Sequence, residues 1–227
     1  MAQITPSGTV IRNTGSVAFQ AGAGIRTTLS NEVTLTVQPL PSRATIGLAR
    51  YDAGSLASST AGPTQCRSSN GFFPLPSPAP QGQGALDPTQ PIPMQDTAIA
   101  HAGDPIFVRV VDVDRNRDAN AIETVDVRVA ARITGDAEVL RLSETGPDTG
   151  VFVGYIATSA SAAQADCALQ VERNSQLDAT YVDPTDDSDE AQADALVDPY
   201  GLVFDSQTGA PVNGARVRLV NQDTGLP

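Results

Sequence analysis

The sequence predicts an all-β protein with an antiparallel β-sandwich at its centre. The chain has 227 residues and 40% hydrophobic residues, which is enough for one sizeable core, although aromatics make up only 4% and tryptophan is absent. Its 19 glycines and 17 prolines fall between short runs rich in valine and threonine. Runs of that length, punctuated by turn residues, are typical of strands in an all-β fold.

Residues 1–40 predict a β-hairpin. Alternation favours strands over Thr9–Phe19 and Glu32–Val37, and Ala21–Gly24 supplies a turn between them. Two strands alone are marginally stable, so we expect them to pair with something else. The run Ser30–Val37 resembles the strand pair that opens many large repeat-containing bacterial surface proteins.

Residues 41–104 predict a first strand over Arg43–Tyr51 and then a loop rich in proline and glycine over Asp52–Thr97. Such a composition favours extended or irregular chain without a sheet ladder. The proline-rich part is either a polyproline ligand for an aromatic groove or a surface loop anchored by Phe72 and Phe73.

Residues 105–198 form the best-patterned block and predict the core of the sandwich. In one run, alternation points Val125, Val127 and Val129 inward. With flanking strands at 43–51 and 196–204, the count reaches the seven or eight of an immunoglobulin-like sandwich. The six strand-length runs are Ile106–Val111, Glu123–Val129, Ala137–Leu142, Val151–Ile156, Ala168–Val171 and Leu177–Val182.

The segment Glu-Thr-Gly-Pro-Asp-Thr-Gly at 144–150 lies at the centre of this block. Gly146 and Gly150 permit positive φ, Asp148 suits a tight turn, and Glu144 can accept hydrogen bonds at a strand crossing, which favours a structural turn over catalysis. Together with the motifs at 110–116, 135–146 and 179–184, the segment resembles an immunoglobulin-like repeat domain of large bacterial secreted and outer-surface proteins. That resemblance implies a structural module at the bacterial cell surface.

Residues 199–227 resemble the first two strands of a carboxypeptidase-regulatory-like or Cna-B-like β-sandwich. The resemblance rests on the turn Asp-x-x-Thr-Gly-x-Pro-Val-x-Gly-Ala at 205–215. We expect this incomplete β-domain either to continue in a longer protein or to be completed by another chain.

A calcium site is predicted in the aspartate-rich loop that follows the first core strand. Oxygen side chains stand at loop positions 1, 3, 5, 7, 9 and 12, which is the ligand spacing of an EF-hand loop, although Arg117 replaces the glycine of position 6. The alternative is a solvated connection in which these side chains satisfy the backbone. The predicted calcium ligands are Asp112, Asp114, Asn116, Asp118, Asn120 and Glu123.

A second acidic cluster lies at 183–190 and contains Asp183, Asp186, Asp187, Asp189 and Glu190. Carboxylates this dense repel one another unless a cation or solvent screens them. The cluster is therefore a second calcium site, part of an ion site shared with the first loop, or a solvated linker, and charge runs usually face water.

Cys66 and Cys167 are the only cysteines. In an oxidising compartment they would close a large loop and stabilise the fold by about 4 to 5 kcal/mol on an entropic estimate. The alternative is two buried free thiols.

The charge balance and residue types exclude several functions. A net charge of -12 argues against nucleic-acid binding, and no stretch is apolar for long enough to span a bilayer. All 14 basic residues are arginine, so lysine isopeptide cross-links are excluded. His101 is the only histidine, no catalytic arrangement surrounds it, and we expect no enzymatic activity.

These observations lead to a functional hypothesis. We expect a secreted, calcium-stabilised structural or adhesive module of a bacterial cell-surface or matrix protein, which contacts other protein domains of its own or neighbouring chains. One alternative is a filament subunit that assembles by β-strand donation. Another is a carbohydrate-binding module.

Overall fold

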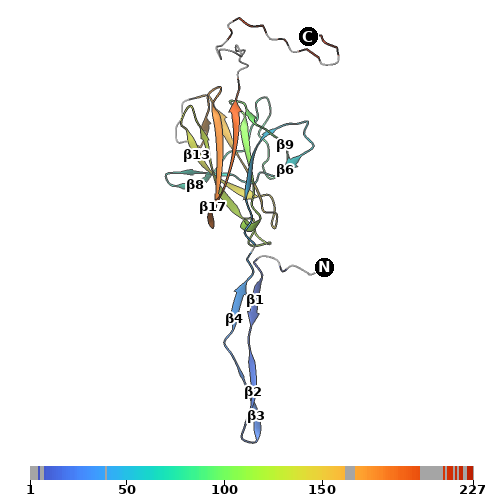
Figure 1. Cartoon of the computed structure of the whole chain (residues 1–227), viewed down its shortest axis with the longest axis vertical. Coiled ribbons are helices and arrows are strands. Elements are labelled where there is room, and N and C mark those ends of the chain that lie inside the picture. Colours follow the sequence, from blue (N-terminus) through green and yellow to red (C-terminus); the bar gives the residue numbers. More distant parts are fainter. Residues whose placement is uncertain are drawn as a thin grey trace.

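The computed structural model describes residues 8–38, 40–161 and 167–199, together with Thr5 and scattered residues between 212 and 226. A two-stranded ribbon spans residues 10–36, and a β-sheet head spans residues 45–197. The ribbon projects from one pole of the head along the long axis of the molecule (Figure 1). The fold is all-β and sandwich-like, which confirms the predicted class.

The ribbon is one long hairpin in two paired segments. β1 (Val10–Asn13) pairs with β4 (Val33–Thr36), and β2 (Ser16–Ala21) pairs with β3 (Gly24–Leu29). Gly22 opens the connecting turn with a φ of 65°, a conformation that glycine adopts without strain. The predicted hairpin is confirmed, and it includes a strand at β3 that the alternation did not identify.

One continuous sheet of thirteen strands forms the head, in the order β10-β17-β16-β12-β13-β14-β11-β5-β9-β6, with β15 beside β14 and the β7–β8 hairpin beside β13. Neighbours pair antiparallel except β10–β17 and β14–β15, which are parallel. The bounds are β5 (Thr45–Tyr51), β6 (Ser58–Ser59), β7 (Gln65–Ser68), β8 (Gly71–Pro74), β9 (Ile92–Asp96), β10 (Ile99–Ala100), β11 (Pro105–Val111), β12 (Thr124–Ala131), β13 (Ala137–Glu144), β14 (Val151–Ser159), β15 (Leu169–Gln170), β16 (Gln176–Asp183) and β17 (Asp186–Val197).

The sheet folds over into two layers at β13. This strand pairs with β12 along most of its length and passes to β14 at Ser143 and Glu144. The fold brings β5 into contact with β17 across the core. Val125, Val127 and Val129 are at most 3% exposed, which confirms the predicted inward face of β12. The largest fully buried side chains include Tyr181, Phe107, Phe152, Ile106, Leu140 and Leu142.

Residues 52–97 hold more sheet than predicted. β9 pairs with β5 and β6, while β7 pairs with β8 and β13, so the expectation of a segment without a sheet ladder is wrong. The prolines are tolerated because these strands are short and lie near sheet edges, as Pro93 and Pro74 do. Phe73 is 48% exposed, whereas the centre of the Phe72 ring lies 3.7 Å from the guanidinium carbon of Arg141.

The predicted last strand at 196–204 is also displaced. β17 begins ten residues before Leu196 and ends at Val197, and residues 200–204 lie outside the described part of the chain. The predicted C-terminal β-domain at 199–227 also lies outside it, apart from Pro199 and the scattered residues.

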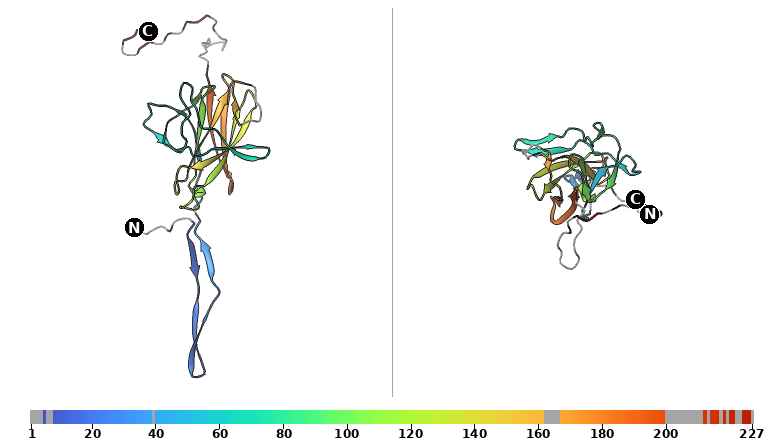
Figure 2. Two further views of the ribbon diagram at one scale, coloured as in Figure 1. Left: turned by 180° about the vertical axis from the view of Figure 1, so that it is seen from behind. Right: turned by 90° about the horizontal axis from the view of Figure 1, so that it is seen from above.

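The described chain enters the head at the pole that carries the ribbon and leaves it at the opposite pole. β5 starts beside the ribbon, and β17 runs the same way and ends at the far pole (Figures 1 and 2). In the described residues, no helix is long and apolar enough to cross a membrane.

Candidate functional site

The aspartate-rich loop lies at the joint between the ribbon and the head. It follows β11, contains a single 3₁₀ turn, η1 (Val113–Arg115), and ends at β12. The backbone N–H of Ser42, in the linker that leaves the ribbon, donates a hydrogen bond of 2.8 Å to Asp114 Oδ2. Gly8, which precedes the first ribbon strand, lies at the same joint. It packs so closely on the loop that a Cβ there would lie 2.5 Å from the carbonyl oxygen of Arg117.

The six predicted calcium ligands do not converge on one point. Asn116 donates to Asp148, Asp118 caps a turn at Asn120, and the carboxylate of Glu123 accepts the N–H of Arg117. An EF-hand loop needs its glycine to curl the chain around an ion, and Arg117 stands at that position. Of the four carboxylates in the set, the structure places Asp112 and Asp114 in one cluster, whereas Asp118 and Glu123 make other contacts.

A third carboxylate joins them from the second acidic cluster. Carboxylate oxygens of Asp112, Asp114 and Asp183 lie within 4.8 Å of one another. Asp112 directly follows β11, Asp114 lies in η1, and Asp183 ends β16. Asp112 is 0% exposed and Asp183 is 1% exposed. Strand ends thus hold two of the three carboxylates inside the protein.

Each of these carboxylates has one oxygen fixed by the protein. The Tyr181 hydroxyl donates to Asp112 Oδ2 at 2.5 Å, and the backbone and hydroxyl of Thr185 both donate to Asp183 Oδ1 at 2.8 Å. Asp112 Oδ1 and Asp114 Oδ1 are buried and have no hydrogen-bond partner. Buried acceptors without partners are rare, and they mark a place where a further group can bind.

Burial raises the pKa of Asp112 to about 7, and its contacts with Asp114 and the charge of Asp183 act in the same direction. Only the hydrogen bond from Tyr181 opposes this shift. Burial, followed by the contact with Asp112, also raises the pKa of Tyr181, so its hydroxyl keeps its proton and remains a donor.

The turn at 144–150 fastens this loop to the sheet. Glu144 Oε1 accepts N–H groups from Thr149 at 2.8 Å and from Gly150 at 2.7 Å. Gly150 has a φ of 61°, and a Cβ there would lie 3.1 Å from the carbonyl oxygen of Asp112. The N–H of Asp112 in turn donates to the Gly150 carbonyl. Gly146 lies in the same turn, and its carbonyl accepts from the Thr149 hydroxyl.

The second acidic cluster is not the solvated linker that its charge favours. It forms the β16–β17 hairpin, in which Asp183 and Asp189 are buried while Asp186, Asp187 and Glu190 are exposed. Asp189 Oδ2 accepts the N–H of Ala44 at 2.9 Å and so ties β17 to the start of β5. Two buried carboxylates therefore serve internal contacts, and sequence reasoning did not distinguish them from the exposed ones.

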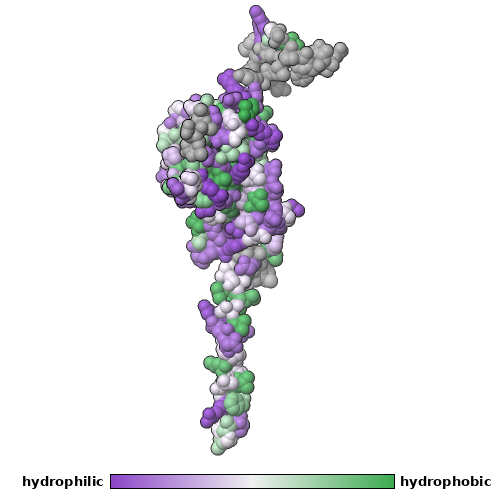
Figure 3. Space-filling view, turned by 90° about the vertical axis from the view of Figure 1, so that its left-hand side faces the viewer, coloured by the Kyte–Doolittle hydropathy of each residue, from purple (hydrophilic) through white to green (hydrophobic). Residues whose placement is uncertain are grey.

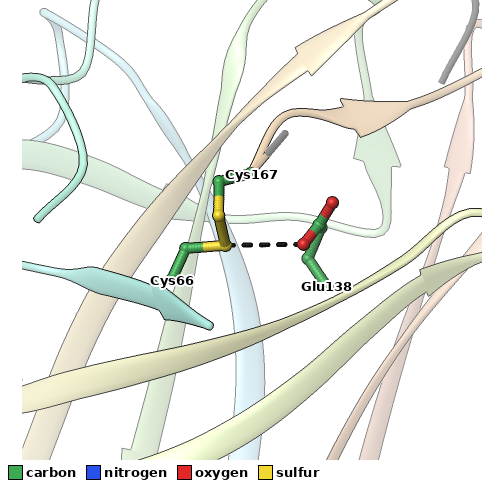
Figure 4. Close-up of side chains that lie close together, drawn as sticks. All are labelled: Cys66, Glu138 and Cys167. Atoms are coloured by element: carbon green, nitrogen blue, oxygen red, sulfur yellow. Dashed lines mark hydrogen bonds between the residues drawn. A yellow bond between two sulfur atoms is a disulfide. The ribbon is translucent and has the colours of Figure 1, made fainter. Parts of the chain in front are cut away.

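Cys66 and Cys167 form a disulfide, which confirms the predicted pair (Figure 4). The bond joins β7 to the residue two positions before β15 and closes a sequence separation of 101 residues. Glu138 on β13 is 5% exposed and points at the bridge, with its Oε2 3.4 Å from Cys66 Sγ (Figure 4).

His101 lies at the far pole. Its Nδ1 is 2.8 Å from Asp198 Oδ1, and this hydrogen bond is the main cause of the lowered pKa of Asp198. Asp198 also accepts the N–H of Ala102, so the pair fastens the end of β17.

Comparison with known proteins adds no family to this description. No protein-family model matches the chain, and no curated protein matches it.

Proposed function

We propose that this chain is a load-bearing structural module of an extracellular bacterial surface or matrix protein. The observation that carries the proposal is the position of the two chain connections, at opposite poles of the head (Figure 1). A tensile force along the molecule would enter through β5 and leave through β17. A module that holds neighbouring domains apart needs this arrangement.

The strand pairing suits such a load. β5 is hydrogen-bonded to β11 on one side and to β9 on the other, and β17 is bonded to β16 and β10. A pull at opposite poles acts along these strands and loads their hydrogen bonds in shear. Many bonds must then fail together, whereas a pull across the strands would open them one at a time.

The disulfide supports an extracellular location, because structural disulfides persist in oxidising compartments and are rare in the cytosol. It also shortens the length of chain that a force can extract. While the bridge is intact, the segment between Cys66 and Cys167 cannot be extended by tension applied at the ends of the chain.

Single-molecule pulling between handles at Leu40, after the ribbon, and Pro199, after β17, tests this function, because these points load the head without first unzipping the ribbon. We expect one abrupt unfolding event, as shear loading requires. Reducing the disulfide should then lengthen the extracted chain by about 350 Å, from the 101-residue separation at ~3.5 Å per residue. A head that unravels gradually at low force would contradict a load-bearing role.

A second function, assembly with further copies of this chain, is favoured by the ribbon. Its large apolar side chains are exposed, as the alternating patches along the ribbon show (Figure 3). Neither edge of the ribbon pairs with another strand of the described residues, and two strands in isolation are marginally stable. The exposed apolar residues are Val10, Ile11, Val17, Phe19, Ile25, Leu29, Val33 and Leu35, with exposed fractions from 46% to 75%.

The mass in solution tests assembly. The double variant Ile25→Thr and Leu29→Thr removes apolar surface from the ribbon and keeps residue types that favour strands. If ribbons of separate copies pack together, the wild type should show a mass that rises with concentration, and the variant should be a monomer. Ile133→Thr, an exposed position on the head, is the matched control. A monomeric wild type at high concentration would exclude self-assembly.

A further inference from the structure

We propose that Asp112, Asp114 and Asp183 bind one hard divalent cation, calcium in preference to magnesium. We infer further that the bound ion stiffens the joint between the ribbon and the head. The cation site does not depend on the structural role proposed above, whereas the value of a stiff joint does rest on it.

The spacing of the three carboxylates fits a single ion. Calcium binds oxygen atoms at about 2.3 to 2.6 Å, so two oxygens on the same ion lie at most about 5 Å apart. The oxygens of the triad lie within 4.8 Å of one another. One ion can therefore contact all three side chains without rearrangement of the strands that carry them.

Two atoms of the triad lack any partner. Asp112 is fully buried, and its Oδ1 accepts no hydrogen bond. Asp114 Oδ1 is also buried and accepts no hydrogen bond. Leaving such acceptors unsatisfied is unfavourable, and two facing carboxylates cannot satisfy each other unless they share a proton. A cation satisfies both oxygens at once.

The triad lies outside the ion pairs of the described residues, although two arginines are near it: the charge of Arg115 acts on Tyr181, and Arg117 lines the same hollow as Asp114 and Asp183. Within the described part of the chain, none of the ion pairs includes Asp112, Asp114 or Asp183. Buried carboxylates are usually paired or bound to metal. Three clustered carboxylates without a direct ion pair among the described residues therefore favour an ion from solution.

The triad borders a cavity that leads to solvent. Asp114 and Asp183 line this hollow of about 420 Å³ together with Asp186, Thr185 and Arg117 and with Gln38 and Pro41 of the linker. Calcium takes six to eight oxygen ligands, and water in this hollow can supply those that the triad does not. Magnesium needs near-ideal octahedral geometry and gives up water reluctantly, so an irregular cluster of carboxylates favours calcium.

The site is connected to the ribbon through Asp114. Asp114 Oδ1 is buried without a hydrogen-bond partner, and Asp114 Oδ2 accepts the N–H of Ser42 in the linker. An ion that fixes Asp114 also fixes that hydrogen bond, because a ligand's other contacts orient it. The ribbon would thereby be held at one angle to the head.

Calcium titration of the whole chain tests the site. Calorimetry at pH 8 should show binding, with weaker binding of magnesium. The melting temperature should rise by about 5 to 10 °C at a calcium concentration near one hundred times Kd. Measurement in sodium chloride of equal ionic strength separates binding from simple screening of an acidic protein. Absence of binding heat and of a melting shift would overturn the proposal in favour of a shared proton.

Variants identify the ligands. Asp183→Asn should abolish the calcium-dependent shift and leave the calcium-free protein at least as stable as wild type, because one repulsive charge is gone. Asp118→Asn is the matched control, since it belongs to the EF-hand spacing but not to the triad. It should keep the full shift. The reverse result, loss with Asp118→Asn and retention with Asp183→Asn, would overturn the triad as the site.

The stiffening needs a separate measurement. Spin labels are attached to cysteines introduced at Thr28 on the ribbon and Asn70 on the head, while the native disulfide stays intact. They report the distribution of distances between the two positions. Calcium should narrow this distribution in the wild type and leave it unchanged in Asp183→Asn. An equally broad distribution in a wild type that binds calcium would overturn the stiffening.

Discussion

Glu144 links three backbone segments with one side chain. It is 3% exposed, and its carboxylate accepts the N–H groups of Thr149, Gly150 and Glu123. Because the acceptor is charged and buried, its loss leaves these donors without partners.

Glu144→Ala should therefore lower the free energy of unfolding by about 2 to 4 kcal/mol, measured by urea denaturation. Asp148→Asn is the matched control in the same turn, because asparagine tolerates the positive φ of 66° at this position. It should change stability by no more than about 0.5 kcal/mol. Equal losses from the two variants would contradict the central role of Glu144.

Two strand glycines on either side of β11 provide a second test at this scale. A Cβ at Gly154 would lie 2.3 Å from Leu142 Cδ2 and 2.9 Å from Thr64 Oγ1, whereas a Cβ at Gly47 would meet nothing within 4 Å. Gly154→Ala should destabilise the head by about 1 to 3 kcal/mol through overpacking, and Gly47→Ala should be neutral or slightly stabilising. Melting temperatures of the two variants measure the contrast directly.

At the scale of elements, hydrophobic alternation predicted most of the core strands. Runs such as 106–111, 123–129 and 151–156 carry large β-branched or aromatic residues, and each became a strand close to its predicted bounds. The signal is strong there because one face of each run is buried by bulky side chains. The disulfide was predictable for a different reason, because a chain with two cysteines allows only one intramolecular pairing.

β17 escaped prediction because its buried face is made of small residues. Ala191, Ala193 and Ala195 alternate along it, and alanine has a low propensity for strands. The acids that precede them, at 186–190, suggested a solvated run, although a strand with one face in water also exposes every second residue. Asp189 differs from its exposed neighbours in a tertiary partner, the N–H of Ala44, which no local pattern reveals. Asp183 makes a local turn contact with Thr185 that the exposed Asp186 repeats with Ser188, so only its tertiary position beside Asp112 and Asp114 sets it apart.

Local sequence patterns also predicted only part of the candidate site. Spacing within the loop predicted a cation near Asp112 and Asp114, and the hypothesis of an ion shared between the two acidic clusters anticipated that they meet. The position of Asp183 depends on how β16 pairs with β12, across a sequence separation of about fifty residues, from Arg128–Thr180 to Ala131–Leu177. Sequence spacing could not give that register.

At the scale of the whole molecule, the disulfide limits the unfolded chain more than any single contact. It closes a separation of 101 residues, for which the entropic estimate is about 4.7 kcal/mol and measured values are typically 2 to 5 kcal/mol. The double variant Cys66→Ser and Cys167→Ser should lose stability in this range, measured by guanidinium denaturation. Reduced wild type is the control and should unfold at a similar midpoint. A variant as stable as the oxidised protein would contradict the entropic argument.

The same disulfide also determines what happens when a protease cuts the chain. The segment between Cys66 and Cys167 contains most of the strands of the head, including the exposed β7–β8 turn at Asn70. If an extracellular protease cut the chain once anywhere in that segment, the two fragments would remain covalently joined through the sulfur atoms. The nicked molecule would migrate as one band without reductant and as two with it. A head built this way could lose a peptide bond and still have its two poles joined by covalent bonds.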